Sequence, residues 1–361
     1  MTFSAGRKVC SVSLDCSQAS EMSPSQKLTD LTNEYSAVKS LGCYIYVMLA
    51  SRYVSLVLGL SVYTLPFKSH TMTTTTQTVT STTLKGANSS DPNYVPRGPV
   101  DAILNFFKDP EDGSKPHNYV EKPTDGTPQR NFGSEDIQVH VEDIRDREDQ
   151  FYLDKDAFQA IKGIPSEEKD FLDDEHIKKV YYPEVEKLLL EHVPGAHKVT
   201  LFDHTIRRSN PDAPRAPVTR VHVDQTARST EWRVKLHNED EAEKLLQGRY
   251  RIINVWRPLN GPVQASPLGF ASADTTRNED LVPVEHRYPH RTGETAAVRH
   301  NKGQQFYYWS GMLNDERLLL KCFDSKDGVG QRVPHTAFVD PRTPEGAKGR
   351  ESIEVRALVY G

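Results

Sequence analysis

Residues 218–229, VTRVHVDQTARS, place His222 and Asp224 two positions apart at the end of an alternating run. On a β-strand, residues i and i+2 project from the same face, so an imidazole nitrogen and a carboxylate oxygen would lie side by side. One cation can bind both groups. The alternative is an ordinary polar strand end, and the rest of the sequence has to decide between the two.

The composition predicts a soluble globular body. Charged residues make up 26% and hydrophobic residues 36% of the 361 residues, and the net charge is −5. No cluster of lysine and arginine alternates with aromatic residues, so we expect no nucleic-acid partner. Three of the four cysteines lie in the first 43 residues and no CxxC pair is present. This pattern favours a reducing compartment, and we expect a cytoplasmic protein.

The first 90 residues differ in composition from the rest. Residues 43–65 are apolar and long enough to span a bilayer. Arg52 lies near their middle, where insertion costs about 2.5–3.5 kcal/mol. Two interpretations stay open: a weak membrane segment, or a segment absent from the working protein. A Thr-rich run at 70–83 follows and is expected to be disordered. We therefore assign 1–90 to an N-terminal region and 91–361 to one domain. Membrane contact is possible only through 43–65.

Hydrophobic periodicity predicts mostly strands after residue 197. The expected strands are 137–144, 198–208, 217–224, 249–259, 305–311, 317–325 and 351–360. The expected helices are 151–165, 238–248, and 166–195, which begins at Ser166 and is split or kinked at Pro183. We expect 91–135 to be an extended lead-in, and VEHRYPHR, with His286 and His290, to be a loop. This order predicts a β-sandwich or barrel with helices packed outside.

The His-x-acid motif is weak evidence by itself. The composition alone predicts about two such pairs, and the sequence holds three, His140/Glu142, His222/Asp224 and His237/Glu239. The second pair is favoured because His335, in RVPHTAFVDP, can supply a third ligand. Two histidines and one carboxylate on one face are the ligands of non-haem Fe(II) oxygenases.

The last expected strand, in GRESIEVRALVYG, carries a candidate anion site. Arg350 and Ser352 share a face, and Arg356 has the same parity. An arginine beside a hydroxyl can bind a carboxylate through charge-assisted hydrogen bonds. The alternative is a basic strand edge paired with Glu351 or Glu354.

Aromatic residues in two expected strands can line a substrate pocket or pack in the core. They are Trp256, Tyr307, Tyr308 and Trp309. Arg257 is expected to be partly buried and paired with an acid or with the substrate. The sequence contains no HExxH, GxGxxG or GxSxG motif. Zinc-hydrolase, dinucleotide-binding and serine-hydrolase functions therefore have no support.

Five segments in this order resemble one family: RVHVDQT, INVWRPLNGPV, LLLKCFDS, PHTAFVDP and RESIEVRALVY. Residues 95–361 look like the fungal AsaB-type hydroxylase/desaturase family, related to cephem-methoxylase-like and gibberellin-desaturase-like oxygenases. The resemblance implies a mainly β protein with flanking helices and a double-stranded β-helix (jelly-roll) core. It also implies an Fe(II)- and 2-oxoglutarate-dependent oxidoreductase that uses O2 to hydroxylate or desaturate a small secondary metabolite.

The resemblance also implies roles for individual residues. His222, Asp224 and His335 match the iron ligands, and Arg350 with Ser352 matches the 2-oxoglutarate site, with Arg356 as the alternative. No catalytic residue beyond the metal ligands is expected. Two other functions stay open: an oxygen-using iron enzyme that does not need 2-oxoglutarate, and a non-catalytic β-sandwich protein that binds a small molecule.

Overall fold

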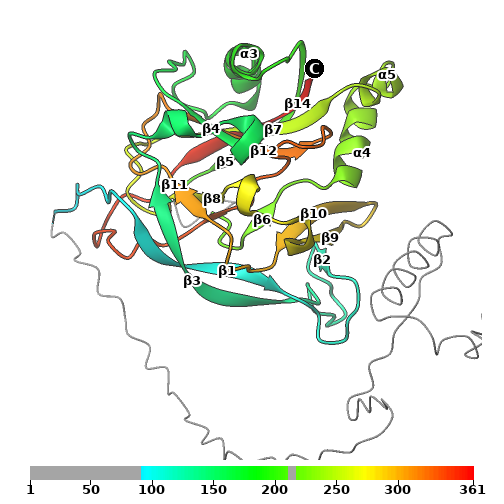
Figure 1. Cartoon of the computed structure of the whole chain (residues 1–361), viewed down its shortest axis with the longest axis horizontal. Coiled ribbons are helices and arrows are strands. Elements are labelled where there is room, and N and C mark those ends of the chain that lie inside the picture. The colour runs from blue at the N-terminus through cyan, green and yellow to red at the C-terminus, as the bar shows by residue number, and fades with distance from the viewer. Residues whose placement is uncertain (1–90, 210–216) are drawn as a thin grey trace, which may run out of the picture. The chain divides into compact units, whose positions relative to one another are not determined.

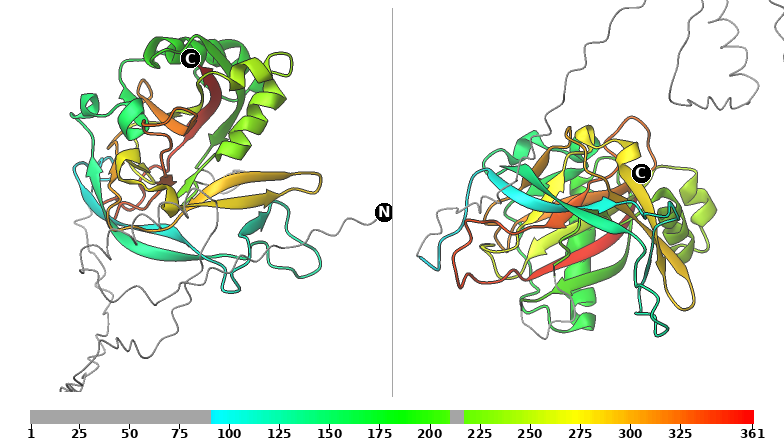
Figure 2. Two further views of the ribbon diagram at one scale, coloured as in Figure 1. Left: turned by 45° about the vertical axis from the view of Figure 1, so that its right-hand side comes forward. Right: turned by 90° about the horizontal axis from the view of Figure 1, so that it is seen from below.

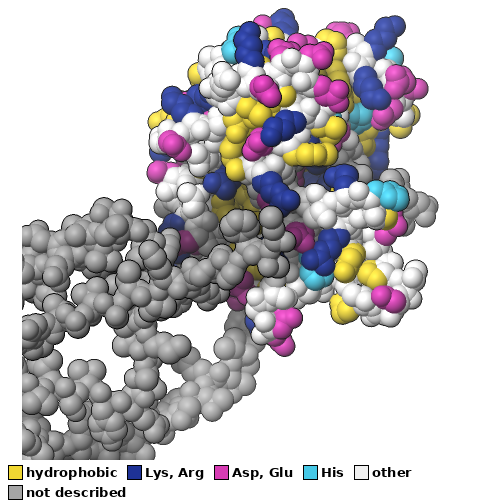
Figure 3. Space-filling model, turned by 90° about the vertical axis from the view of Figure 1, so that its right-hand side faces the viewer, with side chains coloured by type: hydrophobic (Ala, Val, Ile, Leu, Met, Phe, Trp, Pro, Cys, Tyr) yellow, Lys and Arg dark blue, Asp and Glu magenta, His cyan; other side chains and the backbone are white. Residues whose placement is uncertain are grey.

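Two curled β-sheets form the centre of the computed structural model, which describes residues 91–209 and 217–361 (Figure 1). The expectations for residues 1–90, including the apolar stretch 43–65, lie outside the described residues. Within the described part of the chain, no helix is long and apolar enough to cross a membrane. Positive, negative and apolar side chains alternate over one face of the molecule, as the near-neutral net charge leads one to expect (Figure 3).

The larger sheet contains nine strands among the described residues, in the order β1-β3-β11-β8-β13-β6-β10-β9-β2. Their bounds are β1 Val100–Lys108, β2 His117–Tyr119, β3 Gly133–Asp143, β6 His222–Val223, β8 Leu268–Ala271, β9 Leu281–Arg287, β10 Thr292–Val298, β11 Phe306–Tyr308 and β13 His335–Ala337. The β9–β10 hairpin projects from the body of the molecule (Figure 2). The sheet curls so far that Asn105 of β1 forms a parallel bridge with Arg220, just before β6.

The smaller sheet has the order β4-β12-β7-β14-β5. Its strands are β4 Phe158–Ile161, β5 Lys198–Arg207, β7 Tyr250–Pro258, β12 Arg317–Asp324 and β14 Ser352–Tyr360. The two sheets face each other in a jelly-roll arrangement, so the mainly β prediction with flanking helices is confirmed. The helices are α2 Leu153–Asp156, α3 Asp174–His192, α4 Ala227–His237 and α5 Ala242–Leu246, with short 3-10 turns at Glu148–Gln150, Ala273–Thr275 and Asn278–Asp280.

Alternation along β7 and β14 divides the inside of the jelly roll from its helical cover. Odd-numbered residues such as Val255 and Val355 pack in one apolar cluster with residues of α3, which lies over the outer face (Figure 1). Even-numbered residues, including Trp256, Glu354 and Arg356, line a cavity on the inner face. The period of two that predicted these strands therefore also aims their polar side chains into the molecule.

The expected helices differ from the observed ones in extent. The helix expected at 151–165 is wrong, because α2 ends where Ala157 takes a left-handed conformation (φ 63°), and β4 then pairs with β12. The helix expected from Ser166 begins later, at Asp174. The Asp173 side chain caps it by accepting from the His176 backbone N–H at 2.7 Å. It is one helix with Pro183 inside.

Several elements were not expected. Residues 284–287 of the expected loop, with His286, belong to strand β9, which pairs with β10, so the loop prediction is wrong there. His290 lies between β9 and β10, outside both strands, as expected. Helix α4 begins after Thr226, whose hydroxyl accepts from the Ser229 backbone N–H at 3.2 Å. The helix expected at 238–248 is the shorter α5. The expected lead-in at 91–135 contains β1, which pairs along its whole length with β3.

Candidate metal centre and cosubstrate cavity

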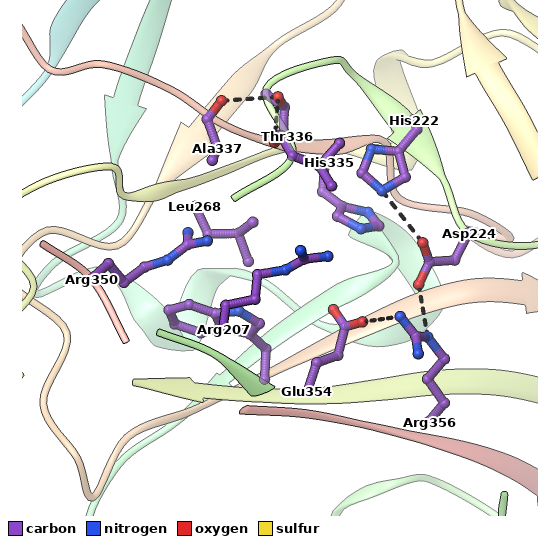
Figure 4. Close-up of a pocket in the computed structure, with 12 residues that line it drawn as sticks. Arg207, His222, Asp224, Leu268, His335, Thr336, Ala337, Arg350, Glu354 and Arg356 are labelled. Atoms are coloured by element: carbon purple, nitrogen blue, oxygen red, sulfur yellow. Dashed lines mark hydrogen bonds and ion pairs between the residues drawn. The ribbon is translucent and has the colours of Figure 1, made fainter. Parts of the chain in front are cut away.

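His222, Asp224 and His335 come together at the inner edge of the larger sheet (Figure 4). His222 begins the two-residue strand β6, Asp224 follows it, and His335 begins β13. The two strands pair so that His335 lies opposite His222. One ligand atom from each of the three side chains lies within 4.8 Å of the others, and among the described residues this is the one such group. Spacing along one strand and the pairing of β6 with β13 together produce a three-ligand face.

Backbone carbonyl groups fix both imidazole rings. Nδ1 of His222 lies 2.8 Å from the Arg220 carbonyl oxygen, and Nδ1 of His335 lies 3.2 Å from that of Val333. A proton on each Nδ1 leaves Nε2 unprotonated, as a metal ligand requires. Burial, aided by the charge of His222, lowers the pKa of His335 to about 4. His335 is therefore neutral at physiological pH and has a lone pair to offer.

Asp224 is held by one oxygen and open at the other. Its Oδ2 accepts from Asn254 Nδ2 at 2.8 Å and from Arg356 Nε at 3.1 Å. Its Oδ1 lies 3.3 Å from Nε2 of His222. Burial raises the pKa of Asp224, but the charge of Arg356 outweighs burial and holds the pKa well below its usual range. The carboxylate is therefore ionised, with Oδ1 directed toward the two histidines.

Arg356 is committed to acidic side chains of the protein. Besides Asp224, its guanidinium contacts Asp203 Oδ1 at 3.0 Å and Glu354 Oε1 at 2.7 Å. These three contacts leave it ill suited to bind a carboxylate of a ligand, the alternative role considered from the sequence. Its place in the structure is that of a positioning residue behind Asp224.

Arg350 lies in the same cavity and has no acidic partner. It is 4% exposed, and its guanidinium packs over the Trp256 ring, 5.3 Å from the centroid. Nε and Nη1 are buried without a hydrogen-bond partner. Burial, and then the charge of Arg207, lower the pKa of Arg350 to about 10. Arg207 and the three candidate metal ligands line the same cavity (Figure 4). An unpaired buried cation is costly, so this cavity is suited to an anion.

The other expected site residues divide between the cavity and the core. Trp256 lines the cavity. Ser352 is buried at the start of β14 but is not among the lining residues. Arg257 points to the opposite face of β7, where it packs over the rings of Phe171 (5.0 Å) and Tyr181 (5.6 Å). Arg257 is buried and forms no ion pair with a described acid, because β-strand alternation turns it toward α3. Its contact with a substrate stays a prediction.

The aromatic residues of β11 and its end do not line this cavity. Tyr308 donates from its hydroxyl to the Gly98 carbonyl at 2.6 Å, and Trp309 donates from its indole to Glu148 at 2.9 Å. Tyr307 lines a separate surface groove with residues of β3. Their expected role at a pocket around the metal ligands is not supported, and core packing, the other interpretation, fits Tyr308 and Trp309.

Sequence reasoning missed Asn254 and Arg207. Asn254 is a fully buried polar residue between apolar neighbours on β7, and its parity with Trp256 is the signal that could have found it. Arg207 ends β5, and only the pairing of β5 with β14 brings it beside Arg350. That pairing joins distant parts of the chain and cannot be read from local patterns.

A buried thiol lies close to the same centre. Cys322 of β12 has no exposed surface and is not in a disulfide. Burial, followed by the charge of Asp224, raises the pKa of Cys322 well above its ordinary value. The thiol is therefore protonated, and it packs in the apolar core with residues of β7 and β14.

Comparisons with known proteins agree with this site. The profile of a family described as "Oxidoreductase/YMDC permease-like domain" matches residues 104–360. The hydroxylase/desaturase poxK of Penicillium oxalicum is 35% identical over 302 residues, covering 73% of this chain and 92% of the relative. The hydroxylase/desaturase asaB of Aspergillus flavus is 43% identical over 135 residues, covering 33% and 59%. The solved structure of the iron and alpha-ketoglutarate-dependent endoperoxidase NvfI superposes with a TM-score of 0.67 at 29% identity, covering 74% of this chain and 99% of that one.

The fold and the three-ligand face thus define a non-haem iron oxygenase of the jelly-roll class. Within that class, the chain belongs to the fungal hydroxylase/desaturase family of Fe(II)- and 2-oxoglutarate-dependent oxidoreductases. The family predicted from the five sequence segments is confirmed. The alternative of a non-catalytic β-sandwich binding protein is not supported, because the relatives are enzymes.

Proposed function

We propose that His222, Asp224 and His335 bind Fe(II), that Arg350 binds 2-oxoglutarate, and that the chain hydroxylates or desaturates a small secondary metabolite with O2. One observation carries the proposal. Three ligand atoms within 4.8 Å of one another share a cavity with a buried arginine that has unpaired nitrogens. The names of the relatives support the same cofactors and reaction types.

The residues present fit both groups. Two neutral imidazoles and one carboxylate are the donor set that Fe(II) takes in this class of enzyme. When bound, the iron and 2-oxoglutarate together supply the oxidising power needed to break an unactivated C–H bond with O2. The protein holds the ligands through Asn254, Arg356 and two backbone carbonyl groups.

Arg350 suits the distal carboxylate of 2-oxoglutarate. A planar guanidinium matches a carboxylate through two parallel hydrogen bonds, and no described residue bonds the guanidinium nitrogens of Arg350. Arg207 adds a second positive charge beside it. Ser352 remains a predicted neutral donor next to Arg350.

The test is binding of 2-oxoglutarate to the metal-loaded protein without oxygen. Arg350→Lys keeps the charge but loses the planar fork, so we expect weaker binding. Arg257→Lys is the matched control, because Arg257 is also buried over aromatic rings but lies outside the cavity. Equal loss in both variants would contradict the assignment. Turnover that needs iron but not 2-oxoglutarate would favour the second candidate, an oxygen-using iron enzyme without this cosubstrate.

We also propose that residues 91–361 form a single oxygenase domain, with 1–90 as a separate N-terminal region. The family match over 104–360 supports this division. A protein that begins at Met72 is expected to bind metal and 2-oxoglutarate as the full chain does. If this shortened protein failed to bind either the metal or 2-oxoglutarate, residues 1–71 would be part of the working enzyme.

A further inference from the structure

Arg220 is the neighbour of a candidate iron ligand on the same face of the sheet. Val221 and Val223 are fully buried in the main apolar cluster, so the residues that alternate with them project from the other face. Those residues are Arg220, His222 and Asp224. One i to i+2 step along a strand is roughly 7 Å, so Arg220 lies one such step before His222.

The Arg220 side chain has no polar partner within the described chain. It makes no hydrogen bond or ion pair with any residue in 91–209 or 217–361, and Nη1 is buried and unpaired. Its guanidinium packs over the Phe132 ring, 4.9 Å from the centroid. Burial, and then the charge of Arg130, lower the pKa of Arg220, but an arginine remains a cation at neutral pH. The fold thus keeps a half-buried positive charge beside the metal centre without compensating it.

Polar and apolar groups both lie around Arg220. His286 of β9 lies near Arg220 and His222. Burial lowers the pKa of His286, and the charges of Arg220 and His222 lower it further. Its Nε2 lies 3.0 Å from Thr295 Oγ1. Ala297 of β10 lies directly opposite His222 in the sheet. An apolar cluster adjoins these groups and consists of Phe107, Phe132, Val282, Val284 and Ala297.

We propose that Arg220 is a specificity-determining residue that binds a carboxylate or other anionic oxygen of the metabolite, whose apolar part packs against the Phe132 cluster. The inference rests on the proposed function and narrows its substrate to an acidic compound. This anion site is separate from the cosubstrate site, because Arg220 does not line the Arg350 cavity. A neutral substrate would leave the guanidinium without a partner, whereas an acid pairs with it through charge-assisted hydrogen bonds.

Benzoate and benzamide test this charge preference with one shape. The full-length protein is first saturated with Mn(II) and 2-oxoglutarate, which fills the Arg350 cavity, and each probe is then titrated calorimetrically without oxygen. We expect benzoate to bind about tenfold or more tightly than benzamide, as a charge-assisted pair implies. Arg220→Gln should remove that difference, and Arg220→Lys should keep part of it.

Arg130→Gln is the matched control. Arg130 also lies over the Phe132 ring, at 6.0 Å, but is exposed, so its loss should leave the preference unchanged. Equal binding of the two probes to the wild-type protein, no binding of either, or an unchanged preference in Arg220→Gln would overturn the proposal. Thermal unfolding of each variant separates misfolding from loss of the site. Failure of the proposed function is seen separately, as absent or Arg350-independent binding of 2-oxoglutarate before any probe is added.

Discussion

Two buried cations, one in the smaller sheet and one just before its strand β14, have opposite surroundings. Lys321 of β12 is fully buried, and its ammonium group bonds Asp324 at 2.6 Å, Asp154 at 3.2 Å and the Gly330 carbonyl at 2.8 Å. Arg350, just before β14, makes no hydrogen bond or ion pair with any described residue. The fold satisfies all three donors of Lys321 and leaves Arg350 unsatisfied.

This difference distinguishes a structural charge from one reserved for a ligand. Burial lowers the pKa of both cations, so both carry a desolvation cost. At Lys321 the protein offsets that cost with its own aspartates, which Arg249 also binds. At Arg350 no described acid forms an ion pair, so a bound anion would offset the cost. Variants at the two places should therefore change different properties.

The largest effect is expected at the metal centre itself. Asp224→Ala removes one of three ligands, and we expect affinity for Fe(II) or Mn(II) to fall by at least about a hundredfold while the fold persists. Metal content after anaerobic loading measures this. Glu142→Ala is the control, because Glu142 belongs to the exposed pair with His140 that has the same sequence spacing. Full metal occupancy in Asp224→Ala would disprove the site.

Arg350→Met should weaken the binding of 2-oxoglutarate without lowering the stability of the ligand-free protein. Loss of a shielded charge-assisted pair costs about 2–5 kcal/mol, so affinity for 2-oxoglutarate should fall between roughly tenfold and several thousandfold. The ligand-free protein should be at least as stable as the wild type, because an uncompensated buried charge is removed. Calorimetric titration and chemical denaturation measure the two quantities. A large loss of stability without ligand would mean that Arg350 is structural after all.

Lys321→Met should lower the stability of the protein and leave the binding of 2-oxoglutarate unchanged. Removing the ammonium group leaves Asp324 buried with fewer partners, and breaking a buried pair in this way costs about 3 kcal/mol. Affinity for 2-oxoglutarate in the folded fraction should not change. Urea denaturation measures the first effect, and unchanged unfolding free energy would remove the contrast between the two cations.

The smallest effect concerns acid stability at the Lys321 cluster. Burial acts to raise the pKa of Asp154, but the hydrogen bond from Arg249 and the charge of Lys321 lower it to about 2. A depressed pKa stabilises the fold above the ordinary value of 3.8, and this contribution disappears as the pH falls through about 2. Asp154→Asn should therefore flatten the pH dependence of unfolding between these values, by on the order of 1–2 kcal/mol. An unchanged slope would show that Asp154 gains nothing from its partners.

The candidate ligands could be predicted because their geometry is local or motif-bound. His222 and Asp224 follow from strand alternation, and His335 and Arg350 from segments shared with a family. Asn254 and Arg207 depend on which strands pair across the sheets, which no local pattern specifies. The strand that contains His286 was missed for another reason: Pro289 within VEHRYPHR suggested a loop, yet β9 pairs fully with β10.

The long strands of the smaller sheet were predicted well, because β5, β7, β12 and β14 are apolar or alternating over eight residues or more. Strand β8, with four residues, is too short for a period to emerge. Helix α2 ends because Ala157 adopts a left-handed conformation, although alanine has a high helix propensity. Local signals therefore located most of the scaffold, and tertiary contacts decided its short elements.

Cys322 has a consequence for the durability of the enzyme. Oxidants attack the thiolate, and burial with the nearby charge of Asp224 keeps this thiol protonated and inaccessible. The Cys322 sulfur, although close to an oxygen-activating metal, is thus protected from oxidation by the enzyme's own reaction while the core stays folded. Alkylating reagents should label it only on unfolding, so the rate of labelling reports how often the core opens.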